Sequence, residues 1–94
     1  MANVSVAATA TVIVAASTQS GGRIGLRIYN NSAVTVFLGP DATVTTANGY
    51  PLLTATEFKF DADGPNPQYF YTGAVYGIVA TGTADVRYWE MQWQ

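Results

Sequence analysis

The chain contains no cysteine and no histidine among its 94 residues. Without cysteine it can form neither a disulfide framework nor a thiolate nucleophile, and without histidine it lacks the usual general base and the commonest zinc ligand. Charged residues are also scarce, at 11% of the chain against about 25% in a typical soluble domain. The lack of these side chains excludes most catalytic and zinc-binding arrangements. Because neither disulfides nor zinc can stabilise the fold, its stability must come from packing or assembly.

The few charges that are present sum to a net charge of −2. No basic field is available to attract phosphates, so we expect no nucleic-acid partner. Hydrophobic residues make up 49% of the chain, and part of the surface must therefore be apolar or neutral. Either Thr, Ser and Asn keep this surface soluble or a protein partner covers it, and we favour the partner.

The N-terminal stretch is apolar, but it has the form of neither a secretion signal nor a membrane span. No Lys or Arg precedes its apolar part, and Thr9 and Thr11 interrupt it, whereas a signal peptide has a basic start and an unbroken apolar centre. It is also shorter than the roughly 20 residues that a membrane helix needs. Residues 1–17 instead predict one long strand or two short ones, forming an N-terminal strand or arm that contacts neighbouring subunits.

Alternation of apolar and polar residues dominates the rest of the chain, and no segment shows helical periodicity. Strands are predicted around residues 23–30, 34–38, 57–61, 69–80 and 84–93, with a brief extended piece at 44–46. The first two, joined by Asn30-Asn31-Ser32, are predicted to pair as a β-hairpin. Turns are expected at Gly39-Pro40-Asp41 and at Asn48-Gly49, and a loop is expected over residues 61–67.

This series of strands predicts an all-β fold. We expect one domain over residues 1–94, built as a small β-sandwich or jelly-roll-like barrel of about seven or eight short antiparallel strands. No internal repeat or linker divides the chain.

Three aspartates, Asp41, Asp61 and Asp63, are the candidates for a metal or acid/base cluster. Asp61-Ala62-Asp63-Gly64 has the spacing that opens a calcium loop, but Pro65 and Pro67 follow and no closing glutamate is present. We therefore favour a solvated turn. A domain of this size also offers little room for a glycosidase cleft between two acids. The chain is predicted not to be an enzyme, with no catalytic residue, cofactor or metal.

Aromatic residues gather toward the C-terminus, at Tyr69, Phe70, Tyr71, Tyr76, Tyr88, Trp89 and Trp93. Exposed rings can serve as platforms for sugar faces, or they can pack against another subunit, and we favour subunit contact. The residues predicted to form a partner interface are Val4, Val12, Val14, Tyr88, Trp89, Met91 and Trp93. Glycan binding through the tryptophans remains the alternative.

Three motifs between Arg23 and Leu52 resemble small virion proteins of tailed bacteriophages. They are R-x-x-L-x-I-x-N (Arg23 to Asn30), V-x-L-G (Val36 to Gly39) and V-T-x-x-x-G-x-P-L (Val44 to Leu52). The similarity continues to about Glu90 and extends to head decoration (cement) proteins and related fibre domains.

The resemblance implies a structural protein on the capsid surface of the virion, made in the host cytoplasm. Its partners would be the major capsid protein or another virion protein. Further copies of itself, as a dimer or trimer, would also be expected. No membrane partner is expected.

Overall fold

The computed structural model describes residues 2–16, 23–61 and 73–92 of the chain. These residues form eight strands and no helix. In chain order the strands are β1 (Ala2–Val6), β2 (Thr11–Val14), β3 (Arg23–Asn30), β4 (Val36–Gly39), β5 (Tyr50–Leu52), β6 (Glu57–Asp61), β7 (Val75–Ile78) and β8 (Ala84–Gln92). Among the described residues there is no helix with the length and apolar character needed to cross a membrane.

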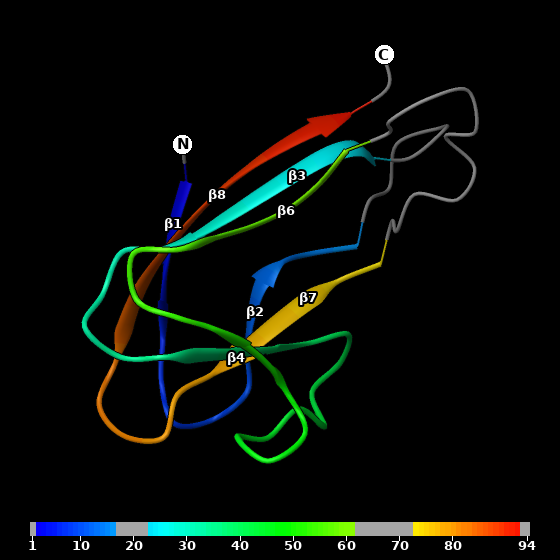
Figure 1. Ribbon diagram of the computed structural model, residues 1–94. Coiled ribbons are helices and arrows are strands. Elements are labelled where there is room, and N and C mark those ends of the chain that lie inside the picture. The colour runs from blue at the N-terminus through cyan, green and yellow to red at the C-terminus, as the bar shows by residue number, and fades with distance from the viewer. Residues whose placement is uncertain (1, 17–22, 62–72, 93–94) are drawn as a thin grey trace.

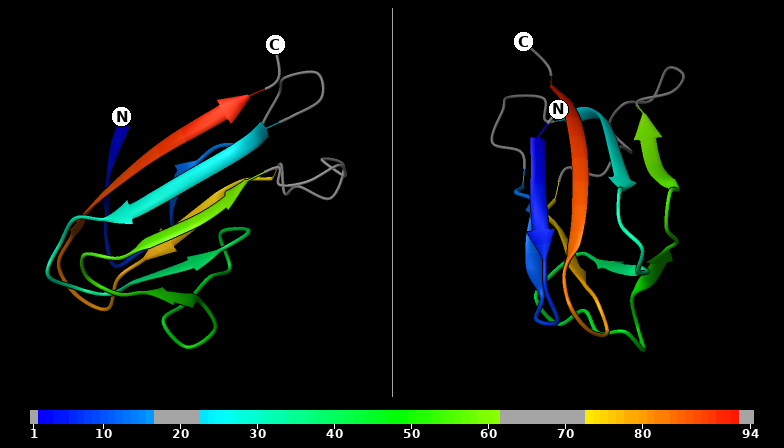
Figure 2. Two further views of the ribbon diagram at one scale, coloured as in Figure 1. Left: turned by 45° about the horizontal axis from the view of Figure 1, so that its top comes forward. Right: turned by 90° about the vertical axis from the view of Figure 1, so that its left-hand side faces the viewer.

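The strands form two four-stranded antiparallel sheets that face each other (Figure 1). The first sheet has the order β1-β8-β3-β6, and the second has the order β2-β7-β4-β5. The right-hand view of Figure 2 shows the first sheet, with β1 at one side and β6 at the other. The all-β sandwich predicted from the alternation of residues is therefore confirmed.

The pairing of the strands is that of a long hairpin rolled up on itself. Strands β1 and β8, β2 and β7, β3 and β6, and β4 and β5 form nested antiparallel pairs. The pairs β3–β8 and β4–β7 then join these arms into sheets. Every connection between consecutive strands crosses from one sheet to the other, except that between β4 and β5. This arrangement is the eight-stranded jelly roll.

The predicted hairpin between residues 23–30 and 34–38 is wrong. Strands β3 and β4 lie in different sheets, and the short connection between them is a crossover. No strand forms at 44–46, where a turn begins at Thr46, and the short strand lies instead at β5, which contains Pro51. Proline is tolerated there because β5 is the edge of its sheet. The predicted strand at 69–80 is observed as β7, and residues 69–72 lie outside the described residues.

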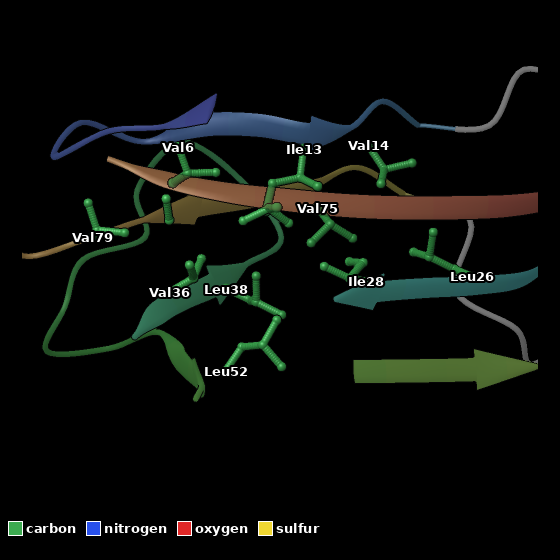
Figure 3. Close-up of a cluster of buried hydrophobic side chains, with 12 residues drawn as sticks. Val6, Ile13, Val14, Leu26, Ile28, Val36, Leu38, Leu52, Val75 and Val79 are labelled. Atoms are coloured by element: carbon green, nitrogen blue, oxygen red, sulfur yellow. The ribbon is translucent and has the colours of Figure 1, made fainter. Parts of the chain in front are cut away.

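The core is a layer of aliphatic side chains between the two sheets (Figure 3). Its members are Val6, Ile13, Val14, Leu26, Ile28, Val36, Leu38, Leu52, Val75, Val79, Ala84 and Val86. Residues 26 and 28 of β3 and residues 36 and 38 of β4 alternate into this layer, since every second side chain of a strand points to the same face. The N-terminal segment contributes to both layers, because β1 pairs with β8 and β2 pairs with β7.

Among the residues whose burial is described, one polar side chain, that of Asn30, is completely buried, with 0% exposed. Its Nδ2 donates to the carbonyl oxygens of Val34 at 2.8 Å and Leu52 at 2.9 Å, and its Oδ1 accepts from Ser32 Oγ at 2.6 Å. Its main chain bonds to Ala55 and Thr56. Asn30 therefore holds together two crossovers, the one after β3 and the one after β5.

Candidate interaction surfaces

The two sheets differ sharply in charge. The chain has four Lys or Arg and six Asp or Glu residues, and eight of these ten lie on β3, β6 and β8 of the first sheet. The strands of the second sheet, TVIV, VYGI, VFLG and YPL, contain no charged residue. Folding thus gathers most of the charges on the strands of the first sheet, and Asp41 lies in the loop after β4.

The outer face of the second sheet is apolar and aromatic. Phe37 of β4 lies opposite Ile78 of β7 on one side and Pro51 of β5 on the other, and Val12 of β2 lies opposite Tyr76 of β7. Directly opposed residues share a face, and their chain neighbours point into the core. We call these five residues the uncharged face. Val12 is 45% exposed, and the others are half-buried or exposed.

The connection between β4 and β5 folds back beside the uncharged face. A Cβ atom at Gly39 would lie 2.6 Å from Val44 Cβ, and one at Gly49 would lie 2.6 Å from Phe37 Cβ. Both glycines therefore permit a close approach that a larger residue would prevent. Val44 is buried, so this loop packs on the outer side of β4, while its Asp41 is exposed.

The outer face of the first sheet carries Trp89 among charged groups. Trp89 lies opposite Arg27, which in turn lies opposite Lys59. The Trp89 side chain is 59% exposed. Arg27 Nη1 lies 3.6 Å from Glu57 Oε1, an exposed ion pair that adds little stability.

Asp85 is the centre of a second polar group on that face. Its Oδ2 accepts hydrogen bonds from Asn31 Nδ2 at 3.1 Å and Arg87 Nη2 at 3.2 Å. The Asn31 hydrogen bond, followed by the contact with Arg87, holds the pKa of Asp85 below its ordinary value. The Asn31 bond ties the start of β8 to the crossover after β3.

Two pockets lie beside aromatic side chains. A pocket of about 330 Å³ at the side of β8 is lined by Ala2, Tyr88, Trp89 and Glu90. An apolar pocket of about 360 Å³ lies between the sheets. Its lining residues are Leu38, Gly39, Pro40, Tyr50, Phe58, Ala74 and Val75.

The Tyr50 and Phe58 rings lie 5.3 Å apart in the apolar pocket. Sequence reasoning missed this pocket because it treated Tyr50 as part of a turn. No local signal shows that β5 and β6 meet there.

The structure separates the seven predicted interface residues. Trp89 and Val12 are exposed, but on opposite outer faces of the sandwich. Val4 and Tyr88 pack against the core, and Val14, 1% exposed, is part of it. The side chain of Met91 and all of Trp93 lie outside the described residues.

The candidate aspartates form no cluster among the described residues, where no group of three or more potential metal ligands occurs. Asp41 accepts hydrogen bonds from the main-chain N–H and the hydroxyl of Thr43, and both bonds lower its pKa. Asp41 thus lies in the turn predicted at Gly39-Pro40-Asp41. The solvated turn predicted at Asp61-Ala62-Asp63-Gly64 stays a prediction, because the side chain of Asp61 and all of residues 62–64 lie outside the described residues.

The residues of the three sequence motifs serve packing and turns. Leu26, Ile28 and Asn30 are buried, and Gly39 and Gly49 accommodate Val44 and Phe37. The exposed Trp89 and Val12 belong to none of these motifs. Two residues of the uncharged face do lie in the motifs, Phe37 within the second and Pro51 in the third.

Comparison with known proteins finds no matching family model, no matching curated protein and no matching solved structure.

Proposed function

We propose that this chain is a structural, non-enzymatic subunit of a tailed-phage particle, most simply a head decoration protein that reinforces the capsid. The uncharged face lies on the major capsid protein in this proposal. The charged face of the first sheet points to solvent.

The observation that carries the proposal is the segregation of charge between the two sheets. A free monomer gains solubility from charges spread over its whole surface. Here the second sheet has none on any strand, while Val12, Phe37, Pro51, Tyr76 and Ile78 line its outer side. Aromatic residues and a depletion of charge characterise the centres of protein interfaces. The arrangement suits a subunit that is covered on one side only.

The fold and the motif resemblance add support of a weaker kind. Jelly rolls build many viral capsid domains, but they also build lectins, so the fold alone does not choose between the two. The resemblance to phage decoration proteins favours the capsid.

Co-sedimentation with capsid shells tests the proposal. Shells assembled from the major capsid protein of the phage that encodes the chain are mixed with wild-type protein or with Val12→Glu, which places a charge in the uncharged face. We expect wild-type protein to pellet with the shells and Val12→Glu to bind at least tenfold more weakly. Thr83→Glu, at an exposed loop position, is the matched control and should bind as wild type. Failure of the wild type to pellet, or equal binding by Val12→Glu, would contradict the proposal.

A second candidate function rests on Trp89. Its exposed ring borders the pocket of about 330 Å³ that Ala2, Tyr88 and Glu90 also line, and aromatic rings beside polar groups suit the faces of sugars. In this case the charged face would bind host glycans. A glycan array tests it: Trp89→Ala should abolish the signal and Val12→Ala should not. An empty array for the wild type would exclude this function.

A further inference from the structure

The four edge strands of the sandwich are not equally protected against pairing with another strand. Natural sheets blunt their edges with charges, prolines or irregular register. Strand β6 carries Glu57 and Lys59, β5 contains Pro51, and β2 has a register shift between Val12 and Val14. Strand β1, Ala-Asn-Val-Ser-Val, has no charge, no proline and an unbroken register with β8. Among the strands that the structure describes, β1 is the unprotected edge.

The hydrogen-bond pattern shows which main-chain groups of β1 face outward. The N–H of Asn31 donates to the carbonyl of Asp85, so residues 85, 87 and 89 of β8 direct their main-chain groups to β3. Residues 84, 86 and 88 therefore direct theirs to β1, where they lie opposite Val6, Val4 and Ala2. The N–H and C=O groups of Asn3 and Ser5 must then point away from the sheet.

The same alternation identifies the outward groups at the opposite edge. Asn30 of β3 donates its N–H to Thr56, on the side of β6, so Ile28 and Leu26 bond to Phe58 and Phe60. The main-chain groups of Lys59 therefore point outward from β6. The two edges of the first sheet are equivalent in backbone geometry and differ in side chains.

We propose that β1 pairs antiparallel with β1 of a second copy of this chain, about a two-fold axis that passes beside Val4. Asn3 of each copy then lies opposite Ser5 of the other, and the outward groups form about four main-chain hydrogen bonds. The two first sheets become one continuous sheet. This inference extends the structural role proposed above but does not depend on the capsid, because it concerns the purified chain alone.

A second copy fits this edge better than an unrelated strand because the edge is complementary to itself. The residues brought together are Asn3 with Ser5 and Val4 with Val4, so no like charges meet. The half-buried Val4 side chains, which pack at the rim of the core, would meet across the axis and bury further apolar surface. Two-fold self-pairing of this kind is the commonest symmetry of homo-oligomers.

Sedimentation equilibrium of the purified chain tests the inference with two proline variants. Ser5→Pro removes an N–H that faces outward and leaves the bonds from β1 to β8 in place, since proline is tolerated at such edge positions. Lys59→Pro removes the corresponding outward N–H from β6 and is the matched control. We expect twice the chain mass of 10.0 kDa for the wild type and for Lys59→Pro. Ser5→Pro should dimerise at least tenfold more weakly.

Amide hydrogen exchange provides a readout that needs no variant. In the wild type, exchange at Asn3 and Ser5 should slow as protein concentration rises, while exchange at Lys59 should stay constant. A wild-type monomer at high concentration would overturn the inference, as would a dimer that Lys59→Pro weakens as much as Ser5→Pro. A monomer that captures only a strand of the capsid protein at β1 would also overturn it, while leaving the capsid proposal intact.

Discussion

At the scale of single residues, the most informative side chain is the buried Asn30. Its amide satisfies two main-chain carbonyls from different parts of the chain, and its carbonyl accepts from Ser32. From the sequence Asn30 was taken as part of a polar connection. Its hydrogen-bond partners lie in the crossover after β3 and in β5, and only the folded structure brings these segments together. The motif that ends in Asn30 thus has a structural explanation.

Replacing Asn30 by alanine should destabilise the fold strongly. The change removes the amide that donates to the carbonyls of Val34 and Leu52, and of these two only Val34 keeps another side-chain donor, the Ser32 hydroxyl. We therefore expect a loss of about 2–4 kcal/mol in unfolding free energy. Urea unfolding measures it. Asn31→Ala, next along the chain but exposed, should lose less than about 1 kcal/mol. Similar losses for the two variants would show that burial of Asn30 is not the cause.

Asp85 should make stability depend on pH. Its pKa lies below the ordinary value of 3.8 in the folded chain, so its contribution is present above 3.8 and is lost as pH falls through the folded pKa. Thermal melts of wild type and Asp85→Asn at pH values above and below 3.8 measure the effect. The wild type should be the more stable above pH 4, and the difference should shrink below it. A difference that does not change with pH would contradict the role given to Asn31 and Arg87.

At the scale of elements, local alternation located most strands but not their partners. Strands β3, β4, β6 and β8 follow the predicted ranges, because each places apolar residues on one face. Strand β5 was missed because Pro51 and the Asn48-Gly49 turn signal outweighed its short extended stretch. The predicted hairpin failed because a short polar connection fits a crossover between sheets as well as a turn within one.

The candidate interaction surfaces were predictable only in part, because local alternation does not show which strands become neighbours. Trp89 was among the residues predicted to form an interface, and it is exposed. The burial of Val14 was not, because the register shift in β2 breaks simple alternation and turns both Ile13 and Val14 inward. The lack of charge on the second sheet is visible in the sequence only once β2, β4, β5 and β7 are known to be neighbours.

The loop between β4 and β5 offers a test of element packing. Gly39→Ala would bring a methyl group to 2.6 Å from Val44 Cβ, which is attached directly to the main chain and cannot move aside alone. We expect a loss of about 1–3 kcal/mol in unfolding free energy from this overpacking. Thr46→Ala, at an exposed position of the same loop, should change stability by less than about 0.5 kcal/mol. A neutral Gly39→Ala would show that the loop does not pack on β4 as described.

At the scale of the whole molecule, the jelly-roll fold gives a chain with few charges two outer faces of different character. Consecutive strands alternate between sheets, so charged strands gather in one layer and uncharged strands in the other. The result is a subunit with one face suited to water, one face suited to protein, and one strand edge left without protection. These three features are the ones that the proposed role in a larger shell requires.

The thermal stability of phage particles tests this claim most directly. Particles with and without the subunit are heated while release of their DNA is followed by dye fluorescence. If the chain reinforces the capsid, particles that carry it should rupture at a clearly higher temperature, and adding purified chain to depleted particles should restore that temperature. Equal rupture temperatures, with no effect of added chain, would contradict the account.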